Sequence, residues 1–86
     1  MLNLGAPAVY AYAASMENSN SELVWYIREY ADMMEVAIRK GNDKDSAAID
    51  AARILFNLHA FLVKNHIRFE DIEAAFGKLG IPLAEE

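Results

Sequence analysis

Residues 47–65 read AAIDAARILFNLHAFLVKN, and this stretch decides the fold. Apolar residues occupy most of its helical circumference. Its few polar residues fall on one narrow stripe, which consists of Asp50, Arg53, Asn57 and Lys64. A helix that is apolar on most sides has to be covered on more than one side. The stretch therefore predicts a central helix of an all-α bundle.

The segment before this stretch predicts another long helix, over residues 20–40. Ser19 and Glu22 have the spacing of a capping box, which begins a helix. Gly41 suits the position just after a helix end. The expected buried stripe recurs at helical spacing and consists of Val24, Ile27, Ala31, Met34 and Ile38.

The connection between the two long helices is short and polar. Asp43 or Asp45 can cap the following helix, which is expected over residues 44–65. Two long helices joined by a short loop pack against each other in antiparallel orientation. The sequence therefore predicts an antiparallel helical hairpin.

Shorter helices are expected at both ends of the hairpin, over residues 8–17 and 69–79, and Gly80 ends the last one. No strand-like alternation of useful length occurs. We therefore expect a single all-α domain over residues 1–86. Because two short helices give limited cover to a helix that is apolar nearly all round, we expect dimerisation to complete the bundle, with a second copy closing the surface around Phe56, Phe61 or Val63.

Composition excludes several functional classes. The chain of 86 residues has no cysteine, so it has neither a disulfide framework nor thiolate chemistry. Its net charge of −5 disfavours direct binding to nucleic acid, which requires basic groups. The N-terminal uncharged run ends at Glu17, too short to span a bilayer, and no basic residue precedes Arg28. We therefore expect a cytoplasmic protein with no membrane partner.

Aromatic residues are the strongest candidates for a binding surface. Two interpretations stay open for them, namely core filling and a protein interface, where Tyr and Trp are enriched. The apolar fraction of 55% is high for so small a domain and favours a docking face. The candidate interface residues are Tyr10, Tyr12, Trp25, Tyr26, Tyr30 and Phe61.

Three carboxylates are candidates for a metal site. Asp32 and Glu35 lie one turn apart, and Asp50 lies at a similar height on the facing helix of the expected hairpin. Carboxylates on facing helices are how bundles hold Mg²⁺. The alternative is that these acids pair with nearby arginines. The two histidines, His59 and His66, are too few for a metal site by themselves, and the apolar neighbours of His59 indicate a packing role.

Three short segments carry a resemblance to a known family: DMME at residues 32–35, DAARILFNL at residues 50–58 and RFEDI at residues 68–72. Over residues 31–76 the chain resembles the all-α NTP pyrophosphatases of the MazG-like and phosphoribosyl-ATP pyrophosphatase groups. The resemblance implies an oligomeric helical bundle in which acids hold Mg²⁺ for cleavage between the α and β phosphates. Here the acidic motifs are degenerate, because Arg53 stands where the family has its closing aspartate.

Two main hypotheses follow. The first is a non-enzymatic interaction module of the regulator or inhibitor type, homodimeric and without a cofactor, which binds another protein through an apolar and aromatic face. The alternative is a Mg²⁺-dependent nucleotide pyrophosphatase, intact or catalytically degenerate. A third hypothesis, an acidic decoy of nucleic acid, is weak because 8 basic residues offset the 13 acids.

Overall fold

The computed structural model describes residues 17–82, which are helical and contain no strand. Three helices follow one another: α2 (Asn20–Gly41), α3 (Lys44–Lys64) and α4 (Phe69–Lys78). The predicted all-α class and the bounds of these three helices are thereby confirmed. The helix expected over residues 8–17 lies almost wholly outside the described residues.

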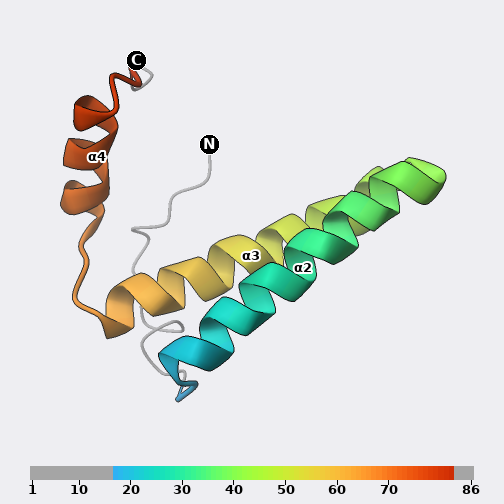
Figure 1. The fold of residues 1–86 in the computed structure, drawn as a ribbon, viewed down its shortest axis with the longest axis horizontal. Helices are drawn as coiled ribbons and strands as arrows, with labels where there is room; N and C mark the ends of the chain where they lie inside the picture. Colours follow the sequence, from blue (N-terminus) through green and yellow to red (C-terminus); the bar gives the residue numbers. More distant parts are fainter. Residues whose placement is uncertain (1–16, 83–86) are drawn as a thin grey trace.

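Helices α2 and α3 form the expected antiparallel hairpin (Figure 1). The turn falls on Asn42, whose φ of 49° is left-handed, so Gly41 is the last helical residue rather than the first one beyond the helix. Asp43 then caps α3, because its carboxylate accepts hydrogen bonds from the Ser46 backbone N–H at 3.1 Å and the Ser46 hydroxyl at 2.8 Å. Local chemistry therefore sets the closed end of the hairpin.

The open end of the hairpin is held by side-chain hydrogen bonds. Ser19 and Glu22 form the predicted capping box at the start of α2. Asn20 and Asn65 exchange two amide hydrogen bonds of 3.1 and 2.9 Å, although they are 45 residues apart in the sequence. This amide pair joins the first residue of α2 to the residue that caps the end of α3.

Helix α4 stands apart from the hairpin (Figure 1) and contacts neither α2 nor α3. The turn before it is left-handed at His66, with φ of 59°, and the Ile67 N–H donates to the Leu62 carbonyl at 2.9 Å. These features form a Schellman motif, a well-defined helix end. The expectation that this helix would cover α3 is therefore wrong, because the turn directs α4 away and leaves none of its residues buried.

The apolar core of residues 17–82 is very small. Only Leu23 and Ala60 are buried hydrophobic residues, with partly buried Phe56, Phe61 and Val63 packed against them. The expected buried stripe of α2 is partly buried at four of its five positions. Its member Ile38 is 44% exposed, while Leu23, which lies outside that stripe, is buried. The most deeply buried position of α2 therefore lies at the edge of the predicted stripe, next to Val24.

The polar stripe of α3 is half buried, because Arg53 and Lys64 are exposed. Asp50 and Asn57 are buried, and the Asn57 amide donates to the Arg53 carbonyl at 2.8 Å. Two apolar residues of the same helix, Ile49 and Leu58, are exposed. Helix α3 therefore buries polar residues as well as the apolar residues that pack on Leu23, and it leaves Ile49 and Leu58 exposed.

By length and composition, α3 is the one helix within residues 17–82 that could cross a membrane, with a mean hydropathy of 1.3 over its most apolar window. Core helices of soluble proteins pass the same test. The middle of the helix carries Asp50 and Arg53, and charged residues are unfavourable in a hydrocarbon interior.

Candidate functional site

Aromatic side chains form a continuous row on α2. The rings of Trp25 and Tyr26 meet edge to face, with centroids 5.3 Å apart, and those of Tyr26 and Tyr30 stack at 6.1 Å. Trp25 is 56% exposed, whereas the two tyrosines are partly buried. The structure therefore brings together three of the predicted interface residues as one row, with its exposed end at Trp25.

Helix α3 supports the inner end of this row. The guanidinium of Arg53 lies 5.2 Å from the centroid of the Tyr30 ring, a cation–π arrangement. The same guanidinium pairs with the buried carboxylate of Asp50 at 3.3 Å. Asp50, Arg53 and Tyr30 thus form a chain of contacts that holds the aromatic row against the hairpin.

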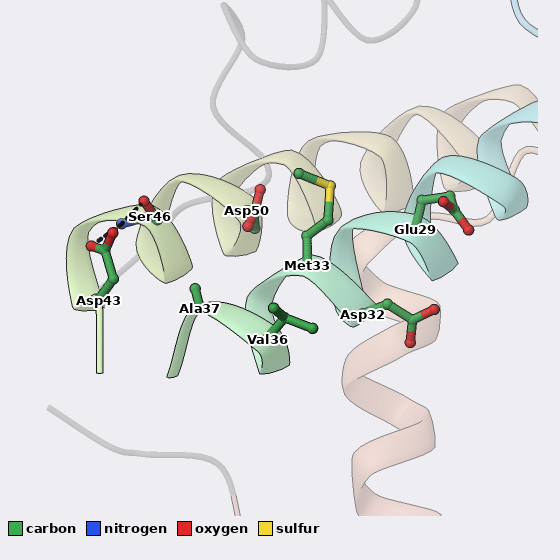
Figure 2. A pocket seen from close by; sticks show the side chains of 8 residues that line it. All are labelled: Glu29, Asp32, Met33, Val36, Ala37, Asp43, Ser46 and Asp50. Atoms are coloured by element: carbon green, nitrogen blue, oxygen red, sulfur yellow. Dashed lines mark hydrogen bonds between the residues drawn. The ribbon is translucent and has the colours of Figure 1, made fainter. Parts of the chain in front are cut away.

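A pocket of about 440 Å³ lies between α2 and α3 near the closed end of the hairpin (Figure 2). It brings together two of the three predicted metal ligands, Asp32 and Asp50, and Asp32 projects from α2 away from Asp50. The residues that line the pocket are Glu29, Asp32, Met33, Val36, Ala37, Asp43, Ser46 and Asp50.

The third predicted ligand, Glu35, is not part of this pocket. Its carboxylate pairs with Arg39 at 2.9 Å, one of the pairings that the sequence left open. Asp50 is likewise engaged by Arg53. Within the described residues, no three acidic or histidine side chains lie close enough together to hold a metal ion.

The remaining predicted interface residues are divided. Tyr10 and Tyr12 lie outside the described residues. Phe61 is partly buried against Leu23 and Ala60, so it contributes to the core of the hairpin. Met33 lines the pocket between α2 and α3 and is 49% exposed, but it was not among the residues predicted from the sequence. The pattern that could have identified it is its position next to Met34, a member of the predicted buried stripe.

His59 is buried as its apolar neighbours predicted, and it is 6% exposed. Burial disfavours the charged imidazolium and lowers the pKa of His59 below its ordinary value. The neutral form is therefore favoured in the folded chain. At the surface, hydrogen bonds from Ser46 lower the pKa of the Asp43 carboxyl, which favours the ionised form at this helix cap.

Comparison of the chain with protein-family models, with curated proteins and with solved structures finds no match.

Proposed function

We propose that this chain is a non-enzymatic protein-interaction module that acts as a homodimer and binds another protein through the aromatic row of Trp25, Tyr26 and Tyr30. The observation that carries the proposal is the imbalance between buried and exposed apolar residues. Within residues 17–82, two hydrophobic residues are buried, whereas nine large ones are exposed: Trp25, Met33, Ile38, Ile49, Leu58, Ile67, Phe69, Leu79 and Ile81. Contiguous exposed apolar surface marks interaction sites, and on α2 the exposed Trp25 continues into the ring contacts of Tyr26 and Tyr30.

The alternative, a nucleotide pyrophosphatase, has less support. Its chemistry needs several acids converging on Mg²⁺. In this chain Glu35 and Asp50 are each engaged by an arginine, and Asp32 projects away from Asp50. Two of the three candidate acids are thus held by ion pairs within the hairpin.

The homodimer is tested by light scattering of the full chain at several concentrations. A mass of about twice 9.6 kDa at micromolar concentration is expected. A compact monomer throughout this range would remove the self-association part of the proposal.

The partner surface is tested by proximity labelling followed by binding of the purified partner to two matched variants. Trp25 and Phe69 are large, similarly exposed aromatic residues on different helices, at 56% and 51%. Trp25→Ser is expected to weaken partner binding about 30-fold, the effect of losing an aromatic hot spot of about 2 kcal/mol. Phe69→Ser should bind as the parent does. Equal affinities of the two variants would show that the aromatic row is not the contact surface.

A further inference from the structure

The aromatic row on α2 leads into the pocket between the two long helices. Tyr26, Tyr30, Met33 and Ala37 follow one another in steps of four, three and four residues. On an α-helix these steps end only about 20° beyond three full turns, so the four residues lie on one stripe. The first two belong to the aromatic row, and the last two line the pocket. The row and the pocket are therefore neighbouring parts of one side of α2.

Helix α3 borders the same side of α2. The Arg53 guanidinium contacts the Tyr30 ring at the inner end of the row, and it pairs with Asp50. Asp50 and Met33 then line the pocket from opposite helices (Figure 2). The contacts thus run without a break from the aromatic row to the pocket. We call the aromatic row and the lining of the pocket together the α2–α3 surface.

The pocket combines an apolar wall with carboxylates. Met33, Val36 and Ala37 supply the apolar wall from α2, and Met33 is 49% exposed. Each helix contributes two carboxylates, and none of the described residues that line the pocket is basic. The four acids are Glu29, Asp32, Asp43 and Asp50.

The negative charge of the pocket is only partly compensated. All 8 Lys and Arg residues of the chain lie within residues 17–82. Of the two ion pairs within these residues, only that of Arg53 with Asp50 reaches the pocket. Glu29 and Asp32 are exposed and have no ion pair in the described part of the chain. The pocket therefore offers uncompensated negative charge beside an apolar wall.

From this arrangement we infer that the α2–α3 surface binds a basic segment of the partner protein, with an apolar residue of that segment on the aromatic row and a Lys or Arg side chain in the pocket. The inference rests on the proposed function and specifies the chemistry of the partner. Lys and Arg lay an aliphatic stem along apolar surface and keep the charged end in a polar environment. The apolar wall and the carboxylates of the pocket match these two parts.

A basic side chain suits the pocket better than a metal ion does. A metal ion needs several oxygen ligands that converge on one point. Asp32 projects away from Asp50 (Figure 2), and within the described residues no three acidic or histidine side chains lie close enough to hold a metal ion. An ammonium or guanidinium group has several N–H donors and can bind carboxylates that lie apart.

The position of the pocket also sets the spacing of the two contacts. Trp25 and Met33 are eight residues apart on α2, which corresponds to about 12 Å along the helix axis. A helical partner segment spans this distance with about eight residues, and an extended segment with about four. The apolar residue and the basic residue of the partner are therefore expected at one of these two separations.

Peptide selection on the immobilised full chain tests the inference. The probe is a random peptide library with chains of about 12 residues, which is long enough to span both contacts. The selected peptides are expected to be enriched in Lys or Arg together with an apolar residue. Selection of apolar peptides without basic residues would overturn the inference, and so would a failure to select any peptide above the uncoated support.

Two matched double variants separate the pocket from the overall negative charge of the chain. Glu29→Gln with Asp32→Asn removes two carboxylates of the pocket, whereas Glu70→Gln with Glu73→Gln removes two exposed carboxylates of α4. The pocket variant is expected to bind a selected synthetic peptide at least about tenfold more weakly than the parent, and the α4 variant within about twofold of it. Circular dichroism checks that both remain helical. Equal losses would indicate general charge attraction and overturn the inference.

The Trp25→Ser variant keeps this inference distinguishable from the proposed function. Loss of the peptide by Trp25→Ser but not by the pocket variant would overturn the basic contact and leave the aromatic row as the interaction surface. Loss by the pocket variant but not by Trp25→Ser would overturn the aromatic row and support the basic contact in the pocket. The inference as a whole expects both variants to lose the peptide.

Discussion

The substitution Leu23→Ala gives the sharpest test of how little core supports this hairpin. Leu23 is 1% exposed and packs against Ala60, with Phe56, Phe61 and Val63 around it. Truncating a buried leucine leaves a cavity and destabilises a protein by about 3–5 kcal/mol. A chain of 86 residues has a free energy of unfolding of about 4–13 kcal/mol. The substitution should therefore remove a large fraction of the total stability.

The loss is measured by urea unfolding followed by far-ultraviolet circular dichroism. We expect a lower midpoint with an unchanged denaturant slope, and a fall in Tm of at least about 12 °C, since 1 kcal/mol shifts the Tm of a small domain by about 4–8 °C. All samples are compared at one protein concentration, because association with a second copy adds concentration-dependent stability.

Leu79→Ala is the matched control. Leu79 is also a leucine, but it lies just beyond α4 and is 71% exposed. Its truncation should change the free energy of unfolding by less than about 0.5 kcal/mol, as surface substitutions usually do. If the two variants lost equal stability, the hairpin would not be organised around Leu23.

Three further predictions concern the cap, the buried histidine and the alternative function. Ser19→Ala should lower the free energy of unfolding by about 1 kcal/mol in urea titrations, because it removes the capping box, whereas Ser21→Ala within the helix should change it much less. The pKa of His59 is lowered in the folded chain, so the unfolded chain binds the imidazole proton more readily. The free energy of unfolding should therefore be largest above a pH of about 6.5 and decrease as the pH falls below that value. Urea midpoints measured across this range should lose that dependence in His59→Leu and retain it in His66→Leu. Incubation of the full chain with Mg²⁺ and a nucleotide panel should release no pyrophosphate above the blank. Release that Glu35→Ala abolished would instead establish the enzymatic alternative.

Two buried polar residues of α3 help to explain why the core is small. Burying the carboxylate of Asp50 is tolerable because Arg53 compensates its charge, and Arg53 in turn contacts the Tyr30 ring. Asp50 and Asn57 occupy buried positions of α3, so fewer of its buried positions are left for apolar side chains.

Local sequence by itself determined where the helices begin and end. The capping box of Ser19, the cap at Asp43 and the stop at Gly80, whose φ is 72°, all depend on contacts within a few residues. Such contacts can be identified without any knowledge of the tertiary fold. The candidate site was predictable in part, since the spacing of the aromatic residues on α2 placed them near one another.

Only the tertiary structure decided which faces meet. A helix that is apolar nearly all round has no unique inward side, so its periodicity does not select one. The choice depends on contacts between residues far apart in the sequence, such as Arg53 with Tyr30 and Asn65 with Asn20. The separation of α4 from the hairpin likewise depends on the turn at His66, and histidine favours the left-handed conformation only weakly compared with glycine. For these reasons the elements were predictable from the sequence, but the packing that buries Leu23 and leaves Leu58 exposed was not.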